Sequence, residues 1–367
     1  MPAGLASLRR LRNNAPACVL VAGAKGTITN AVDGSMSRRW ICLGLMAVAL
    51  ALLPLAAPAV AQPAPPEGFP DRPLVIVVPY GKGGGSHQLS AAMAAALRKV
   101  VGQKVRLLNR PGRGGINGLE AFQTMEPDGY SVLQHIDDVV SLYAAGAIKV
   151  NPAEDLAPLA ITQITFSQIY IRALETRFSD WDSFQAYARA NPGEVTIANV
   201  GAPRSMERVS MFNLEQATGI VTKTVAFDKP AERYQALIRG DVDLLFEQPG
   251  DVRPFLDRKL IKPILTLLPE RPHAFAEAAS LNDLGIDTAP LLRFRGFYVH
   301  KNVPEAHRKY LEWAFAEAFK SRRYQKFNRK KYMDLIDSYR DTEGSRELIN
   351  KAVETYRQSY KMMGISQ

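Results

Sequence analysis

The sequence predicts an α/β protein of two domains, the second inserted in the first. Three observations favour this organisation. An apolar run at 74–78 leads into a glycine-rich loop and then into helix-forming sequence, as expected for a strand buried on both faces of a parallel sheet. A second strand, glycine-rich loop and helix follow, which indicates parallel strands joined by helical connections. The same succession returns after Trp181 in a separate stretch of the chain.

The elements of the first domain follow from hydrophobic periodicity and from the residues that begin and end helices. Ser86 is expected to cap the helix after the first strand, and Gly102 to end it. That helix carries apolar residues at helical spacing, namely Leu89, Met93, Ala96, Leu97 and Val100. Strands are expected at 104–108 and 130–133, separated by a glycine-rich loop at 109–115 and by a helix with Leu119, Phe122 and Met125.

The second domain repeats this alternation. Its expected elements are, in order, a helix at 181–189, a strand at 195–199, a helix at 206–217, a strand at 221–227, a helix from Pro230 to Gly240 and a strand at 242–246. The chain after Pro304 is expected to be mainly helical. Its segment 320–331 holds seven basic residues in twelve. That segment is either a solvated helix face or a docking patch for an acidic partner.

The N-terminal region predicts export to the periplasm. A short basic start at 37–39 precedes an almost wholly apolar run at 40–55, and Ala59-Val60-Ala61 matches the small residues that signal peptidase cuts. We therefore expect a cleavable signal peptide, removed after Ala61. The general secretory route and the twin-arginine route both stay open.

The expected division of this region has three parts: an upstream segment at 1–35 that lies outside the working protein, the signal peptide at 36–61, and a proline-rich lead-in without regular structure at 62–70. Translation would then start at Met36, with Met1 as the alternative. An uncleaved membrane anchor also stays open, because 41–61 is long enough to cross a bilayer.

Removal of the leader changes the composition. It leaves 306 of the 367 residues, which is enough for two domains, and it takes away both cysteines, Cys18 and Cys42. The mature chain then has no disulfide, no cysteine nucleophile and no thiolate metal site. Six basic residues and one acidic residue also leave, so that the net charge falls from +10 to +5. This mild excess fits an anionic solute, and nucleic acid is not expected as a partner.

Short landmarks follow one another in a definite order, at 77–80 with 83–85, 109–112 with 114–115, 127–130, 155–158, 190–193, 240–244 and Phe297. Together they resemble the extracytoplasmic solute receptors of tripartite tricarboxylate transporters, also called the Bug family. The resemblance covers roughly 70–364, almost all of the mature chain.

The resemblance implies a type II periplasmic-binding-protein fold, with two α/β lobes joined by two crossover strands and a ligand cleft between the lobes. Lobe 1 would comprise 71–164 plus 297–367 and lobe 2 would comprise 165–296, with crossovers near 161–170 and 293–297. It also implies a monomeric receptor without cofactor or enzymatic activity, which delivers a small carboxylate-bearing solute to membrane transporter subunits.

Ligands in open α/β sheets lie beyond the carboxyl ends of strands. Four loops meet that condition, at 80–87, 134–138, 201–205 and 227–229. Main-chain amides of a glycine-rich turn and a helix start can hold a carboxylate there, and closure of a hinge would bury it. The predicted ligand-binding residues are Tyr80, Lys82, Gly83, Gly84, Gly85, Ser86, His87, Ile136, Asp137, Asp138, Gly201, Ala202, Arg204, Ser205, Phe227 and Glu247.

The pocket departs from the family pattern. His87 replaces a small polar residue, usually aspartate, and Gly81-Lys82 replaces prolines. Asp137 or Asp138 would suit an amine or hydroxyl on the ligand, whereas Lys82, Arg204 or Lys229 would suit a carboxylate. These residues suggest the hypothesis of a solute that carries both kinds of group, or of a polar aromatic acid.

Other sites are disfavoured by spacing. Gly81-Lys82 precedes the glycines, so a triphosphate loop is absent, and the third glycine of a dinucleotide fingerprint is missing. A metal site is not expected from His87, His135, Asp137 and Asp138, which lack a helical ligand spacing. No nucleophile elbow surrounds Ser86. A periplasmic sensor, or an exported enzyme that uses His87, remains an alternative function.

Overall fold

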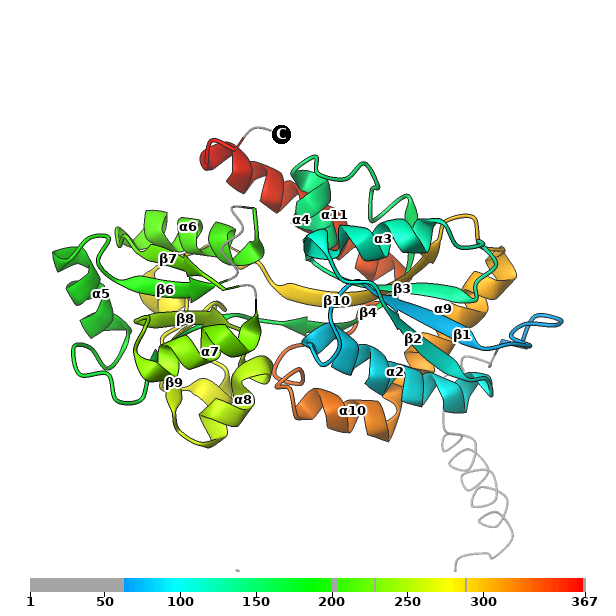
Figure 1. Cartoon of the computed structure of the whole chain (residues 1–367), viewed down its shortest axis with the longest axis horizontal. Helices are drawn as coiled ribbons and strands as arrows, with labels where there is room; N and C mark the ends of the chain where they lie inside the picture. The colour runs from blue at the N-terminus through cyan, green and yellow to red at the C-terminus, as the bar shows by residue number, and fades with distance from the viewer. Residues whose placement is uncertain (1–62, 200–203, 228, 288, 366–367) are drawn as a thin grey trace, which may run out of the picture. The chain divides into compact units, whose positions relative to one another are not determined.

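The computed structural model describes residues 63–199, 204–227, 229–287 and 289–365, and the strands of this part form two five-stranded sheets (Figure 1). The first sheet has the order β2-β1-β3-β10-β4. Its strands are β1 (Leu74–Val78), β2 (Val105–Asn109), β3 (Ser131–Ile136), β4 (Leu156–Thr165) and β10 (Arg293–His300). β1 pairs in parallel with β2 and β3, whereas β10 lies antiparallel between β3 and β4.

The second sheet has the order β7-β6-β8-β5-β9. Its strands are β5 (Gln168–Arg172), β6 (Thr196–Asn199), β7 (Lys223–Ala226), β8 (Leu244–Glu247) and β9 (Ile261–Thr266). β6 pairs in parallel with β7 and β8, and β5 lies antiparallel to β8 and β9. Two connections join the sheets, one from β4 to β5 through Phe166 and Ser167, the other from β9 to β10.

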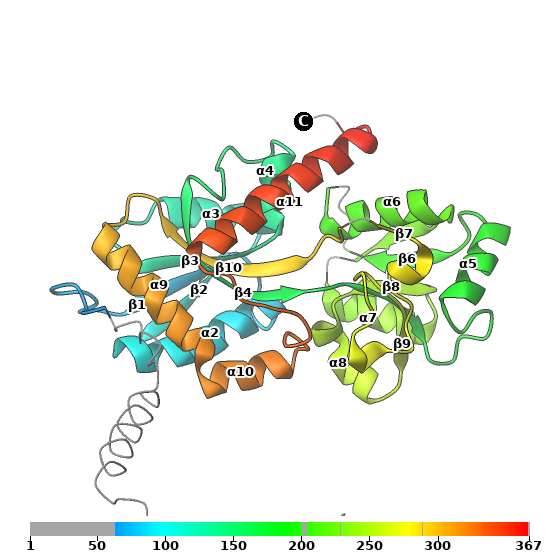
Figure 2. The ribbon, with the colours of Figure 1, turned by 180° about the vertical axis from the view of Figure 1, so that it is seen from behind.

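Helices cover both sheets (Figure 2). In chain order they are α2 (Gly85–Val101), η1 (Arg113–Gly115), α3 (Ile116–Gln123), α4 (Asp138–Ala144), α5 (Trp181–Ala190), α6 (Met206–Thr218), α7 (Pro230–Arg239), α8 (Pro249–Asp257), η2 (His273–Phe275), η3 (Asn282–Leu284), α9 (Glu305–Lys320), α10 (Arg322–Arg329) and α11 (Thr342–Met362). Among these helices, α2 and α9 pack on one face of the first sheet, and α3, α4 and α11 pack on the other.

Strand alternation explains this division of the first sheet. Successive side chains of a strand point to opposite faces. Ile76 of β1 and Val132 of β3 therefore pack in the same cluster as Met93 of α2. Val77 and Leu133, one residue further on, pack in the other cluster with α3, α4 and α11. A sheet buried on both faces is what the continuous apolar run of β1 indicates.

Several sequence expectations are confirmed. Gly102 and Gly240 end their helices in the left-handed conformation, with φ of 71° and 82°, as a residue without a Cβ can. The helix expected at 181–189 is α5. Its N-cap, Asp180, accepts a hydrogen bond from the Ser183 amide at 2.9 Å, and its buried face includes Trp181 and Phe184.

Two expectations are wrong, and two elements were not expected. Ser86 does not cap α2: the N-cap is Gly84, and Ser86 lies inside the helix and is buried. The expected loop at 134–138 is mostly regular structure, because β3 continues to Ile136 and α4 begins at Asp138. The helix α8 and the strand β9 were not expected; β9 forms the edge of the second sheet beside β5.

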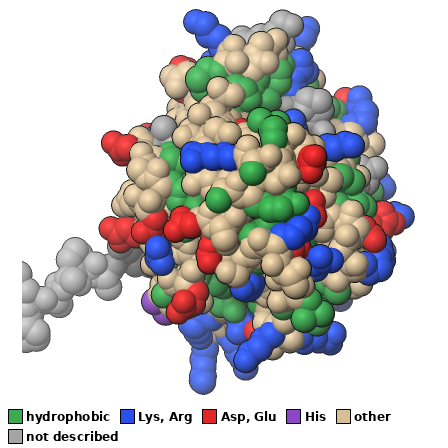
Figure 3. Space-filling view, turned by 90° about the vertical axis from the view of Figure 1, so that its left-hand side faces the viewer, with side chains coloured by type: hydrophobic (Ala, Val, Ile, Leu, Met, Phe, Trp, Pro, Cys, Tyr) green, Lys and Arg blue, Asp and Glu red, His purple; other side chains and the backbone are tan. Residues whose placement is uncertain are grey.

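The signal peptide expected at 36–61 and the upstream segment lie outside the described residues. Within the described part, no helix has the length and apolar character that crossing a membrane requires. Figure 3 shows one face of the molecule, on which Lys and Arg side chains and Asp and Glu side chains are interspersed. The lobe boundaries at 164 and 297 stay a prediction.

Candidate functional site

The loop between β1 and α2 presents main-chain groups to its surroundings. Gly83 has φ of 83°, a conformation that favours glycine, and Gly84 is extended with φ of −71°. Gln88 closes the loop: its amide nitrogen donates to the Gly84 carbonyl at 3.0 Å and its Nε2 donates to the Gly83 carbonyl at 2.7 Å. The first amides of α2, a helix of 17 residues, therefore start from a fixed exposed loop.

A guanidinium group lies against this helix start. A Cβ built on Gly85 would lie 2.9 Å from Nη2 of Arg295, which comes from β10 and is only 5% exposed. Nη2 donates to Asp251 Oδ2 of α8 at 3.2 Å, and Nη1 donates to Gln163 Oε1 of β4 at 3.2 Å. Nζ of Lys331 lies 3.7 Å from the other oxygen of Asp251. This group of residues, Gly85, Gln163, Asp251, Arg295 and Lys331, is called the basic end below.

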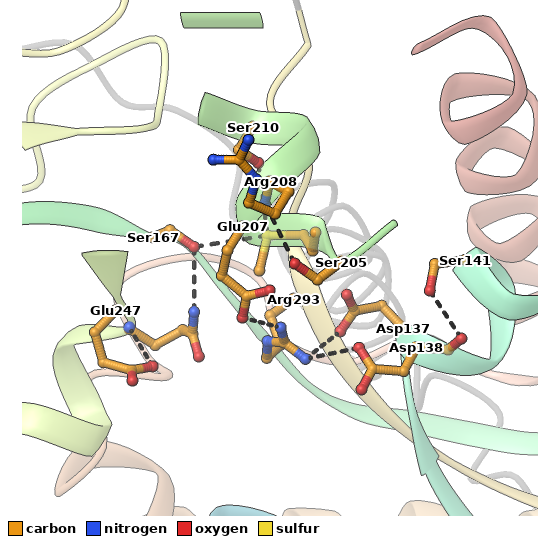
Figure 4. Close-up of polar contacts among 12 residues, drawn as sticks. Asp137, Asp138, Ser141, Ser167, Ser205, Glu207, Arg208, Ser210, Glu247 and Arg293 are labelled. Atoms are coloured by element: carbon orange, nitrogen blue, oxygen red, sulfur yellow. Dashed lines mark hydrogen bonds and ion pairs between the residues drawn. The ribbon is translucent and has the colours of Figure 1, made fainter. Parts of the chain in front are cut away.

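A second arginine of β10 lies among three carboxylates (Figure 4). Arg293 Nη1 lies 3.1 Å from Asp137 Oδ1 and 3.4 Å from Asp138 Oδ1, and its Nη2 donates to Glu207 Oε1 at 2.8 Å. Asp137 and Asp138 lie at the start of α4, whereas Glu207 lies in the first turn of α6, beyond the second sheet. Arg293, Asp137 and Glu207 are all buried. These four residues are called the acidic end below.

Burial controls protonation in the acidic end. It raises the pKa of Asp137 to about 7, against the opposing effect of Arg293, and it also raises the pKa of Asp138. Burial alone would lower the pKa of Arg293, but Asp137, Glu207 and Asp138 raise it above its ordinary value. Arg293 is therefore a permanent cation held by three acids.

Aromatic side chains complete the acidic end. The Tyr356 hydroxyl of α11 donates to Asp137 Oδ2 at 3.3 Å, and the Tyr80 hydroxyl donates to Asp138 Oδ2 at 3.3 Å. Tyr80 also lies 3.4 Å from Nδ1 of His135, which is fully buried. Burial lowers the pKa of His135 to about 4, so this histidine is neutral at neutral pH. The predicted residues Tyr80, Asp137 and Asp138 thus come together.

The strand β8 and the helix α7 contribute another charged pair. Glu247 ends β8, and its Oε2 accepts hydrogen bonds from Arg233 Nη2 at 2.6 Å and from the Tyr234 hydroxyl at 3.0 Å. Glu247 and Arg233 are both buried. Ser205 is the N-cap of α6, because its Oγ accepts a hydrogen bond from the Arg208 amide at 3.3 Å. This cap orients the first turn of α6, which carries Glu207.

The other predicted site residues lie outside the acidic and basic ends. Nδ1 of His87 lies 3.0 Å from Asn109 Oδ1, and Asn109 Nδ2 donates to the Tyr80 carbonyl at 2.8 Å. Lys82 is exposed, and Ile136 is buried at the end of β3. Phe227 is half-buried, and its carbonyl oxygen accepts a hydrogen bond from Arg233 Nη1. The Arg204 carbonyl accepts from the Tyr360 hydroxyl at 2.8 Å. Gly201 and Ala202 lie outside the described residues.

Sequence reasoning missed the two arginines of β10 and their partners Glu207 and Asp251. The available signal was Arg293-Phe294-Arg295 at the start of a strand that is otherwise apolar and aromatic, because a buried arginine requires a partner. His135 was predicted in a loop and lies in a strand.

In the part of the chain that the structure describes, no group of three or more His, Cys, Asp or Glu residues is arranged to hold a metal.

Comparisons with known proteins agree with this fold. The model of the tripartite tricarboxylate transporter family receptor matches residues 90–363. A UPF0065 protein from the gbd 5′ region of Cupriavidus necator is 29% identical over 250 residues, which cover 68% of this chain and 75% of that protein.

Two solved structures extend the comparison. MatC from Rhodopseudomonas palustris with bound malate has a TM-score of 0.67 and 20% identity, over 79% of this chain and 99% of its own. A second R. palustris protein, with adipate, has a TM-score of 0.69 and 17% identity, over 81% of this chain and 99% of its own. The two-lobe periplasmic-binding fold that the resemblance implied is confirmed. The chain belongs to the family of tripartite tricarboxylate transporter receptors.

Proposed function

We propose that this protein is a periplasmic receptor that binds one small carboxylate-bearing solute between its two sheets and delivers it to the membrane subunits of a tripartite transporter. The observation that carries the proposal is the basic end: the amino terminus of a long helix, with Arg295 buried against its first residue Gly85. Helix amino termini attract anions through their unpaired amides and the helix dipole. Arginine adds a planar set of donors that matches a carboxylate.

Two solved relatives with the same fold support the solute class. One holds malate and the other adipate, and both molecules are small dicarboxylates. A carboxylate between the α2 amides and Arg295 would be held by charge-assisted hydrogen bonds from both sides. We therefore assign the predicted residues Gly83, Gly84 and Gly85 to main-chain binding of that group.

Ion pairs relate the site to hinge closure. Arg293 pairs with Glu207 of α6, and Arg295 pairs with Asp251 of α8, so that each arginine of β10 contacts a helix beside the second sheet. Opening of the two lobes would separate these pairs, and closure around a solute would restore them. A receptor that closes in this way binds and releases its solute without chemical change.

Calorimetric titration with a panel of small mono- and dicarboxylates, malate and adipate included, tests the proposal. We expect at least one to bind with 1:1 stoichiometry and to be recovered unchanged. Gly84→Val should abolish binding and keep the fold: the nearest atom to its Cβ is the Gly81 carbonyl oxygen at 3.6 Å, whereas its bulk would block approach to the main chain.

The matched control is Gly81→Val in the same loop, which has open space around its Cβ. It should bind like the wild type. Wild-type affinity in Gly84→Val would remove this loop from the site, and turnover of a bound solute would contradict the receptor assignment.

The remaining parts of the proposal concern the mature protein. We propose that it is a monomer, that it is cleaved after Ala61, and that its lobes comprise 71–164 plus 297–367 and 165–296. Amino-terminal sequencing of protein purified from its host checks the cleavage: a first residue of Gln62 is expected, and retention of 36–61 would indicate an anchor. Light scattering checks the monomer.

A further inference from the structure

The acidic end carries more negative charge than its neighbours balance. Within the part of the chain that the structure describes, Asp137, Asp138 and Glu207 form ion pairs with one guanidinium, that of Arg293. The next cation, Arg233, lies near enough for Glu207 to help raise its pKa, but its guanidinium forms its ion pair with Glu247. Buried charge without a partner is costly. Two negative charges are thus in excess when all three acids are ionised, in a place where Asp137 and Glu207 are at most 5% exposed.

The basic end has the opposite balance. Among the described residues, Arg295 and Lys331 form ion pairs with one carboxylate, that of Asp251, and the helix dipole adds partial positive charge at the start of α2. Within the described residues, several buried polar atoms have no hydrogen bond: Nε of both Arg293 and Arg295, Ser90 Oγ of α2 and both amide atoms of Gln134 of β3.

The register of the first sheet places the Gln134 side chain toward α2. Gln134 pairs with Phe297, and paired residues of neighbouring strands point to the same face. Phe297 packs in the cluster that contains Leu89 and Met93 of α2. A fully buried amide without a hydrogen-bond partner, on the face of the sheet that α2 covers, indicates an interaction that the described residues do not supply.

The two ends are a short distance apart. Arg293 and Arg295 are two residues apart on β10, which corresponds to about 7 Å between their Cα atoms. One small molecule can therefore contact both ends at once.

We infer that the solute carries a cationic group in addition to its carboxylate, with the cation received by Asp138 and Glu207 and the carboxylate received by the α2 amides and Arg295. This inference rests on the proposed function and specifies its solute class. A dicarboxylate would bring its second negative charge to the acidic end, where repulsion opposes binding. An amino acid whose ammonium and carboxylate lie at opposite ends of a short chain neutralises both ends.

The raised pKa of Asp137 fits this arrangement. Burial and the neighbouring acids Asp138 and Glu207 favour its protonated form, whereas Arg293 opposes them. Tyr80 and Tyr356 also face these acids. A bound cation would stabilise the ionised carboxylates and so lower that pKa.

Calorimetry with solutes matched in chain length tests the inference, with glutarate against 5-aminovalerate and succinate against 4-aminobutyrate. We expect the amino acid of a pair to bind at least about 10-fold more tightly, which corresponds to about 1.4 kcal/mol. Equal or tighter binding of the dicarboxylates overturns the inference and leaves the proposed function standing. Failure of every carboxylate to bind contradicts the proposed function and the inference with it.

Variants locate the cation site. Asp138→Asn and Glu207→Gln should each reduce the preference for the amino acid at least about fivefold and should leave or improve dicarboxylate binding. Glu305→Gln, which alters an exposed ion pair with Lys309 on α9, is the matched control and should keep the preference. An unchanged preference in both Asp138→Asn and Glu207→Gln, in folded protein, overturns the assignment.

A second measurement does not depend on the panel. Mass spectrometry of receptor purified from its host without dialysis identifies the solute that it retains. A retained solute with a basic nitrogen and a carboxylate supports the inference, and a retained solute without a cationic group overturns it.

Discussion

Two arginines of one strand, Arg293 and Arg295, have different surroundings. Arg293 contacts three carboxylates, whereas Arg295 contacts one carboxylate and one amide oxygen and lies against the start of α2. The charge of Arg293 is therefore more than balanced by its neighbours, whereas Arg295 can attract a further anion. The comparison teaches that the local balance of charge, more than the type of side chain, decides whether a buried arginine supports the fold or binds a ligand.

Substitution of Arg293 should have the largest effect on stability. Arg293→Met leaves the buried Asp137 and Glu207 and the half-buried Asp138 without their cation, which should lower the free energy of unfolding by about 3–5 kcal/mol. Urea denaturation measures the loss. Adding Glu207→Gln to Arg293→Met should restore part of it.

The control for this substitution is Lys301→Met, which breaks an exposed ion pair with Asp155. Its effect should be small, because exposed pairs contribute little to stability. A similar loss in both variants would contradict the distinction between the acidic end and the protein surface.

Substitution of Arg295 should affect binding more than stability. Arg295→Gln removes a charged donor from the basic end, so the affinity for the tightest-binding carboxylate of the panel should fall by about 10- to 100-fold. Calorimetry measures the change, with Arg271→Gln, at an exposed pair with Asp283, as the control. Unchanged affinity in folded Arg295→Gln would show that the two arginines do not differ as argued.

Asp137 provides a test by pH. Its pKa is raised to about 7 in the folded protein from an ordinary value of 3.8, so the folded state holds a proton that the unfolded state has lost between these values. The contribution of this group to stability is therefore complete below about pH 4 and is lost as the pH rises to about 7. Asp137→Asn should lack this decline when unfolding is followed by denaturant between pH 4 and pH 8. A wild type that declines no more than Asp137→Asn would contradict the raised pKa.

Substitutions of the exposed basic residues of α10 should have the smallest effect on solute affinity. The side chains of Arg322, Arg323, Lys326 and Lys330 are exposed on or just after α10. Replacing all four by glutamine should leave solute affinity within about twofold of the wild type, because none contributes to the basic or acidic end. Calorimetry measures this affinity.

The same variant tests the predicted docking patch. If the patch docks on a transporter subunit, uptake of the solute by cells should fall although the affinity for the solute is unchanged. Uptake equal to that of the wild type would identify a solvated helix face.

The β1–α2 loop could be predicted because its chemistry is local. An apolar strand, consecutive glycines and a helix lie within a few residues of one another, and the anion-binding groups are main-chain amides. Even here, Ser86 was assigned to the wrong position. Helix starts are defined by backbone geometry, and Gly84 has the extended conformation of an N-cap.

The acidic end could be predicted only in part. Asp137 and Asp138 stood out as charges after an apolar strand, but Arg293 and Glu207 come from segments far along the chain. The extension of β3 to Ile136 was also missed, because Gln134 and His135 interrupt the apolar run and burial overrides their polar character.

The sequence by itself determined that this chain is a two-domain α/β receptor of its family, because buried strands, helix ends and glycine turns are encoded by neighbouring residues. It also determined that acidic and basic residues lie near strand ends. Only the tertiary structure decided which of them meet: the antiparallel β10, between β3 and β4, brings Arg293 to Asp137 and Asp138 and Arg295 to the start of α2. The physical reason is that charge balance is a sum over neighbours in space, and the chain order does not contain those neighbours.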